Sequence, residues 1–215
     1  ASNTAGTSNF RAGVNAGNSI TSGGNYNVVV GDEAGTALTT GDNNVAVGFE
    51  ALSTEDAHGN STAIGYRSLK TQNAGAEAYN VAVGVDSALS LTTGADNTFV
   101  GAFAGGGAAI TGGRNVGVGR NALYTLTSGA SNVAVGELSS DAITSGSRNV
   151  SVGGLALSDD TLGKYSIAIG YGALQTQNFT TDTATYNVAV GYQAGNDITT
   201  GIQNTLLGGL AGDVL

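Results

Sequence analysis

The sequence contains no cysteine, proline, methionine or tryptophan, and it contains only one histidine. Without cysteine, the chain forms no disulfide framework and offers no thiolate ligand to a metal ion. Its net charge of −9 opposes binding to nucleic acid or to an anionic membrane. No apolar run approaches the roughly 18 residues of a membrane span, so no membrane insertion is expected. No signal peptide is visible at Ala1, and we expect a mature or excised segment.

Glycine is abundant instead, with 36 of the 215 residues, and much of it is regularly spaced. The motif Asn-Val-Ala-Val-Gly, found at residues 44–48, returns twelve times with small changes. The motif glycines, most often 17 residues apart, are Gly13, Gly31, Gly48, Gly65, Gly84, Gly101, Gly119, Gly136, Gly153, Gly170, Gly191 and Gly208. A short period across the whole chain indicates stacked structural units. The hydrophobic content of 40% argues against disorder.

Each unit predicts one coil of a parallel β-solenoid. The three residues before the glycine, such as 45–47, form a short strand, and the glycine permits a turn that a Cβ would forbid. Thr-Thr-Gly segments, as at residues 39–41, predict a second turn. The expected fold is all-β, with about twelve 17-residue coils whose strands stack about 4.8 Å apart.

A longer repeat lies over the short one, because Gly13 and Gly119 are 106 residues apart and their neighbours repeat at similar intervals. We expect residues 1–8 to be a linker or frayed end, residues 9–118 to form one six-coil block, and residues 119–215 to form a second block of one continuous solenoid. Insertions at 71–79 and 176–186 fall at the same place in each block. Neither end carries an obvious cap, so we expect more fibre, another domain or another copy to cover the ends.

Asparagine stands four residues before the glycine in most motifs, and Ser61 and Ser166 replace it in two. We predict that these asparagines hydrogen-bond the backbone of the next coil, as in stacked cross-β ladders, rather than bind a ligand. The predicted structural ladder consists of Asn27, Asn44, Asn80, Asn97, Asn115, Asn132, Asn149, Asn187 and Asn204.

The residue two places before the glycine is small in most coils, so the strand is apolar on both faces, as a doubly buried strand is. We expect the flanking valines to fill the core of the coil and the small residues to face neighbouring chains in a homotrimer. The predicted assembly seam consists of Ala46, Ala63, Ala82, Ala134, Ala168 and Ala189. The alternative is that small residues merely fit a tight bend.

No catalytic, cofactor-binding or metal-binding residue is predicted. His58 stands alone in a turn-like segment, and the acidic pair at 55–56 lacks the oxygen spacing of a calcium loop. Rigid rods carry recognition on their loops, so candidate recognition residues lie in the longer insertion: Gln177, Asn178, Phe179 and Asp182. Aromatic residues directly after motif glycines either offer a stacking platform for sugars or cover the outer wall: Phe49, Tyr66, Tyr171 and Tyr192.

The pattern Asn-Val-Ala-Val-Gly-x-x-Ala, at residues 44–51 and 187–194, resembles the head repeats of trimeric autotransporter adhesins. It more closely resembles repeats of bacteriophage tail fibres and related bacterial fibre proteins, and residues 187–195 match best. The resemblance covers residues 9–212, although the adhesin repeat is usually shorter than the coil found in this chain. It implies a trimeric solenoid outside the cytoplasm, on a virion or cell surface, in adhesion to a receptor or glycan.

We therefore expect a structural, non-enzymatic fibre segment that presents surfaces for adhesion or host attachment. One alternative is a subunit of an extracellular filament in which single solenoids stack end to end. A second is an acyltransferase with a left-handed hexapeptide helix, which needs an aliphatic residue every six positions and a catalytic histidine. A third, an ice-binding solenoid, is disfavoured because the threonines lie at turns and are missing from several coils.

Overall fold

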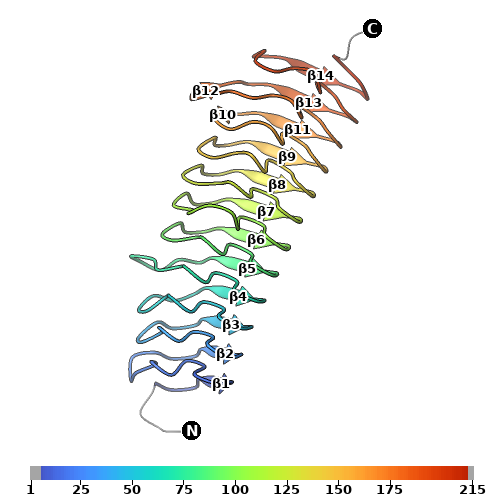
Figure 1. The fold of residues 1–215 in the computed structure, drawn as a ribbon. Helices are drawn as coiled ribbons and strands as arrows, with labels where there is room; N and C mark the ends of the chain where they lie inside the picture. Colours follow the sequence, from blue (N-terminus) through green and yellow to red (C-terminus); the bar gives the residue numbers. More distant parts are fainter. Residues whose placement is uncertain (1–5, 213–215) are drawn as a thin grey trace.

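A computed structural model describes residues 6–212 as a stack of β-coils, with no helix among those residues. Each coil contributes one three-residue strand to a sheet of twelve parallel strands. These strands are β1 (Phe10–Ala12), β2 (Val28–Val30), β3 (Val45–Val47), β4 (Thr62–Ile64), β5 (Val81–Val83), β6 (Thr98–Val100), β7 (Val116–Val118), β8 (Val133–Val135), β9 (Val150–Val152), β11 (Ile167–Ile169), β13 (Val188–Val190) and β14 (Thr205–Leu207). The coils lie one above another along a rod, with β1 and β14 at opposite ends (Figure 1). The predicted parallel β-solenoid is confirmed.

The sheet is continuous across the expected boundary between the two six-coil blocks, because β7 pairs with both β6 and β8. A second, two-stranded sheet joins β10 (Gly163–Lys164) to β12 (Thr183–Ala184). β12 lies in the longer predicted insertion, so this insertion contributes a strand to the second sheet. Residues 1–5 of the expected linker lie outside the described range. Within the rest of that linker, the backbone N–H of Thr7 donates a hydrogen bond to the side chain of Asn25. Within residues 6–212, no helix is long and apolar enough to span a membrane.

The strands pair in register, so that each position of the motif lies over the same position in the next coil. In one such pair, Val45 lies opposite Thr62 and Ala46 lies opposite Ala63. Stacked threonines add hydrogen bonds at the turn, where Thr127 Oγ1 donates to the carbonyl of Thr144 at 3.0 Å. The repeat therefore places each residue type in a column that runs along the rod.

Left-handed residues bend every coil. In the third coil, φ is 133° at Gly48, 54° at Glu50 and 50° at Leu52. A Cβ on Gly48 would lie 2.4 Å from the carbonyl oxygen of Gly65 in the next coil. The motif glycine is therefore required for two reasons, its left-handed backbone and the close approach of the coil above it.

The predicted inside and outside faces of the strand are reversed in the structure. The six alanines of the expected seam, Ala46, Ala63, Ala82, Ala134, Ala168 and Ala189, are all fully buried in the core of their own chain, with 0% exposure. The flanking residues Val45 and Val47 are only half-buried and point outward. The prediction that these alanines face a neighbouring chain is therefore wrong, because the coil is narrow and accepts a small side chain beneath the strand.

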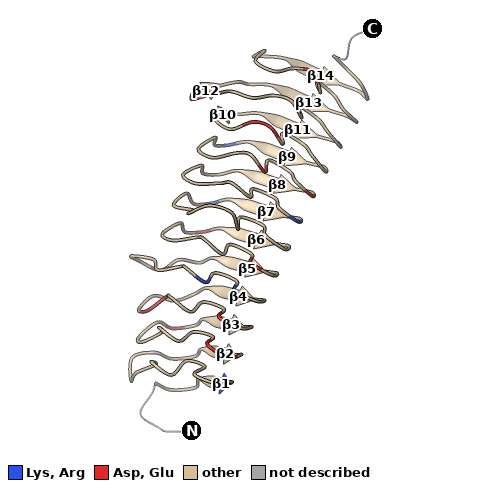
Figure 2. Cartoon of the chain, in the orientation of Figure 1, with Lys and Arg blue, Asp and Glu red and all other residues tan. Residues whose placement is uncertain are grey.

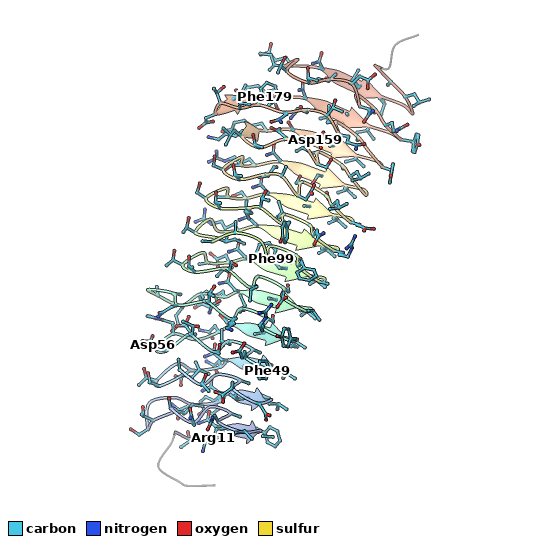
Figure 3. The ribbon with its side chains drawn as sticks, viewed as in Figure 1. Arg11, Phe49, Asp56, Phe99, Asp159 and Phe179 are labelled. Carbon is cyan, nitrogen blue, oxygen red and sulfur yellow. The ribbon has the colours of Figure 1, made fainter. Side chains whose placement is uncertain are left out.

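In the core, the size of the middle strand residue is matched by the size of the residue four places after the motif glycine. Five of the twelve coils combine a small residue in the middle of the strand with a leucine four places after the glycine, as in Ala46 and Leu52. Where the strand carries a large residue, the partner position is glycine. A Cβ on Gly105 would lie 2.7 Å from the ring of Phe99, and one on Gly35 would lie 3.2 Å from Val29. Phe99 lies fully inside the stack (Figure 3).

Candidate functional site

The outward side of the main sheet is a long apolar surface within residues 6–212. We call it the valine face and define it as the first and third residues of the twelve main-sheet strands. Most of these 24 positions carry valine or isoleucine, and none carries a charge. Exposure is 39% at Ile64, 36% at Val135 and 38% at Ile169. The arrows of β2 to β9 are tan throughout, with charged residues confined to the turns and connections (Figure 2).

The valine face is long and narrow, with threonine at three of its positions. Twelve strands spaced about 4.8 Å apart and three residues wide give a strip of roughly 55 Å by 10 Å, about 550 Å² in projection. This matches the largest apolar patches of typical monomers, which often mark interaction sites, and approaches the ~800 Å² that each partner contributes to a standard interface. β-Branched side chains in straight columns also give a regular surface that a copy of itself can match. The face is therefore the best candidate for a functional surface.

The asparagine column lies beside this face and holds its strands in register. The Asn132 Oδ1 accepts a hydrogen bond from the backbone N–H of Asn149 at 3.0 Å. The Asn132 Nδ2 donates to the carbonyl of Gly146 at 2.9 Å. Equivalent bonds recur along the column, and all the predicted ladder asparagines are buried except the half-buried Asn204. These residues have the structural role that the sequence predicts for them, and their buried amides are satisfied internally.

Two buried networks replace the missing rungs at Ser61 and Ser166. At the second, the Gln177 side chain donates to Asp160 at 2.6 Å and to Ser166 at 2.9 Å, and its oxygen accepts from Asn187 at 2.8 Å. At the first, Gln72 bonds Glu55, Ser61 and Asn80 in the same way. Each glutamine thus fills the space that a shorter serine leaves in the asparagine column.

The predicted recognition loop is consequently divided between inside and outside. Gln177 is 0% exposed and Phe179 is 6% exposed, so the prediction that they contact a receptor is wrong. They are buried because the insertion supplies the missing rung instead of projecting from the rod. Asn178 and Asp182 are exposed, and Asp182 forms an ion pair with Lys164 at 2.6 Å.

Glu55, Asp56 and His58 form a group whose ligand atoms lie within 4.8 Å of one another. Glu55 is fully buried and is already occupied by protein donors. Its Oε2 accepts from Gln72 and from the backbone N–H of Ala74, both at 3.1 Å, while its Oε1 lies 3.3 Å from His58 Nδ1. The carboxylate therefore has a structural role in the first buried network.

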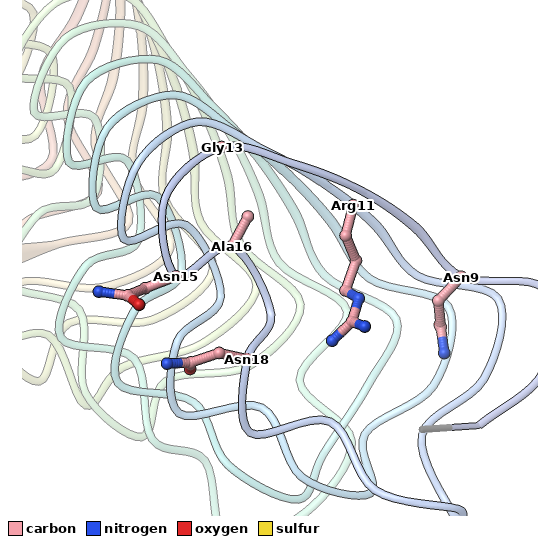
Figure 4. Close-up of a pocket in the computed structure, with 6 residues that line it drawn as sticks. All are labelled: Asn9, Arg11, Gly13, Asn15, Ala16 and Asn18. Atoms are coloured by element: carbon pink, nitrogen blue, oxygen red, sulfur yellow. The ribbon is translucent and has the colours of Figure 1, made fainter. Parts of the chain in front are cut away.

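The first coil forms an open hollow of about 470 Å³ at the β1 end of the described chain. Figure 4 shows Arg11 reaching across this hollow from the strand position that is small in most other coils. Its guanidinium donates to the carbonyl of Gly17 at 2.7 Å. The aliphatic stem of Arg11 thus takes the place of a core side chain while its charge stays near solvent.

Two buried side-chain oxygens in the described part of the rod, one on Asp141 and one on Asn196, lack a hydrogen-bond partner. Asp141 Oδ1 is buried and has no hydrogen-bond partner among residues 6–212. Burial raises the pKa of the Asp141 carboxyl to about 6, and the charge of Asp159 adds to this effect against an opposing backbone hydrogen bond. Because the folded pKa exceeds the unfolded value, the contribution of Asp141 to stability is full below about pH 4 and is lost as the pH rises through 6.

Replacing Asp141 by asparagine is therefore expected to stabilise the fold at pH 7 by about 1 kcal/mol, after allowance for the partial exposure of the group. At pH 4 the wild type and D141N are expected to unfold at similar temperatures. Thermal unfolding followed by circular dichroism at both pH values measures the difference. The exposed Asp197 provides the matched control, since D197N should shift neither midpoint. An equal effect of D141N at both pH values would contradict the assignment.

The sequence pattern does not distinguish the valine face from the buried face of the strand. The interface predicted from the sequence therefore lies on the wrong side of the strand. One signal was available in the pairing of large and glycine residues, such as Phe99 with Gly105, which marks the middle strand residue as internal. Comparisons of the chain with family models, with curated proteins and with solved structures found no match.

Proposed function

We propose that the chain is a rigid segment of a homotrimeric fibre, in which three parallel rods pack their valine faces around a common axis. The segment acts mechanically, by presenting loops or a neighbouring domain at a distance from an anchoring surface. The resemblance of its motif to tail-fibre and adhesin repeats favours three chains and a place on a virion or a cell surface. The receptor is a molecule of the opposing surface, and the rod itself performs no catalysis.

The observation that carries this proposal is the uncharged valine face. A rod that worked as a monomer would be expected to place threonine, lysine or glutamate there, since exposed sheet faces are usually polar. Burying two columns of valine and isoleucine against two other chains removes this surface from water. The seam is therefore assigned to the outward residues, and the alanines of the motif belong to the core of each chain.

A second candidate assembly is an extracellular filament of single rods stacked end to end. Within residues 6–212, β1 and β14 each pair with only one strand, so each has an open edge. An open edge of parallel strand templates further pairing. This arrangement leaves the valine face exposed, which makes it the weaker of the two candidates.

Replacing Val135 by lysine is expected to abolish the trimer, because it places three lysines together at the apolar axis. Burial of unpaired charges costs several kcal/mol, so association should weaken by at least about 100-fold. Ser128, exposed on a turn of the neighbouring coil, provides the matched control as S128K. Analytical ultracentrifugation measures the mass of both variants, and circular dichroism checks their folding. Loss of association in S128K alone, or in neither variant, would contradict the proposed interface.

A further inference from the structure

A column of outward side chains runs along the rod directly after the motif glycines. Two pairs of aromatic rings stack in it, Phe49 on Tyr66 at 5.6 Å between centroids and Tyr171 on Tyr192 at 5.9 Å. The interplanar angles are 12° and 13°. Tyr171 and Tyr192 are 51% and 55% exposed, so both rings remain open to solvent outside the contact between them. The column therefore shows that flat rings fit the spacing of successive coils.

The same column has a gap beside Tyr171. Gly154 occupies the position between Glu137 and Tyr171, so one rung has no side chain. The result is an open hollow of about 220 Å³, lined by Glu137, Leu138, Gly154, Leu155 and Tyr171. Because coils are about 4.8 Å apart, the rungs of Glu137 and Tyr171 lie roughly 9.6 Å apart. The ring of Tyr171 leans to within 3.3 Å of the Cβ position of Gly154, and the remaining hollow has room for about one ring. We call this hollow the Gly154 notch.

The two walls of the notch differ in chemistry. One is the face of Tyr171, backed by Tyr192. The other is Glu137, whose Oε1 accepts from Arg120 Nε at 3.1 Å and from Arg120 Nη2 at 2.7 Å. The Glu137 Oε2 has no hydrogen-bond partner among the described residues, so it remains available to a donor. Arg120 balances the charge of Glu137, which leaves the notch close to neutral.

We propose that the Gly154 notch binds one neutral pyranose ring of a glycan. The ring takes the place of the missing rung, with its apolar C–H face against Tyr171 and a hydroxyl group donating to Glu137 Oε2. Aromatic side chains favour such flat, partly apolar partners because they combine a large apolar face with little conformational entropy. A cation is disfavoured because Glu137 is already paired with Arg120. The site requires the folded rod and does not depend on trimer formation.

Saturation-transfer NMR on the full chain tests the notch with three sugars, lactose, N,N′-diacetylchitobiose and methyl α-mannoside, and with choline as a cationic comparison. We expect transfer to the ring protons of at least one sugar. The variant G154Q removes no polar group, because glycine has no side chain. Its new side chain would enter the notch, because a Cβ on Gly154 would lie 3.3 Å from the exposed ring of Tyr171. Transfer should be about 5- to 10-fold weaker in G154Q and in Y171A.

The matched control is Y66A, which removes a stacked ring from the same column without touching the notch. Y66A should retain the transfer of the wild type. The proposal is overturned if no sugar receives transfer, or if G154Q binds as well as the wild type. Stronger transfer to choline than to every sugar would also overturn it, in favour of a cation site. Circular dichroism checks each variant, and G154Q decides the outcome if Y171A fails to fold.

Discussion

Replacement of Phe99 by alanine is expected to destabilise the middle of the rod by about 3–5 kcal/mol, the usual cost of removing a buried phenylalanine. The ring is fully buried, and it lies against two positions where the chain has glycine. A Cβ would approach the ring to 2.7 Å at Gly105 and to 2.8 Å at Gly117. These two positions therefore carry no side chain that could fill the cavity.

The cavity left by F99A can be filled from the partner position. Leucine occupies the equivalent of Gly105 in several coils, including Leu52 and Leu123, with φ of 50° and 53°, close to the 59° of Gly105. The double variant F99A/G105L thus gives this coil the layout found in the coil of Ala46 and Leu52, and it should recover most of the lost stability. G105L alone should be destabilised, because the leucine and the ring compete for the same space.

Amide hydrogen exchange measures the effect of F99A, G105L and the double variant on the stability of each coil separately. This is possible because stability in a stacked repeat is mainly a sum over neighbouring units. Protection in β6 should fall in both single variants and return in the double variant, while protection in β11 changes little. Additive losses in F99A/G105L would contradict the exchange of volume between the two positions.

Replacement of Gly136 by alanine is expected to destabilise the stack by at least about 3 kcal/mol, through backbone strain and a clash that no side chain can relieve. The φ of Gly136 is 138°, and a Cβ there would lie 2.5 Å from both the carbonyl carbon and oxygen of Gly153. To avoid this contact, two coils must separate, which also stretches the hydrogen bonds between them. Thermal unfolding followed by circular dichroism measures the loss.

Gly154 provides the matched control for this clash, because it lies in the next coil but has no left-handed φ. The atom nearest to its Cβ position is 3.3 Å away, in the ring of the exposed Tyr171. G154A should therefore unfold within about 0.5 kcal/mol of the wild type. Similar midpoints for G136A and G154A would show that the glycine column has no structural requirement for glycine.

The period of the sequence predicts the stack of coils well, because glycine marks the end of every main-sheet strand. It does not predict which face of the strand is internal. A strand with alanine between two valines is apolar on both sides, so the alternation that usually separates core from solvent gives no direction. The orientation follows from packing volumes, which become visible only when Phe99 is placed beside Gly105 or Val29 beside Gly35.

The predicted recognition loop is partly buried for a different physical reason. Polar residues in an insertion usually lie on the surface, but Gln177 replaces a hydrogen-bonding rung that Ser166 is too short to supply. The same pair recurs as Gln72 and Ser61 in the first block, so the duplication contained this signal. A long polar side chain in step with a missing asparagine is better read as its substitute than as a contact for a receptor.

Sedimentation equilibrium of the wild-type chain measures whether the valine face joins copies of the rod, and the result is independent of molecular shape. The chain has a mass of 21.0 kDa, and three chains together have three times that mass, 63 kDa. We expect a single species near 63 kDa that loses mass when Val135 is replaced by lysine. A species that stays at 21.0 kDa over the whole concentration range would contradict the assignment of the valine face as an interface.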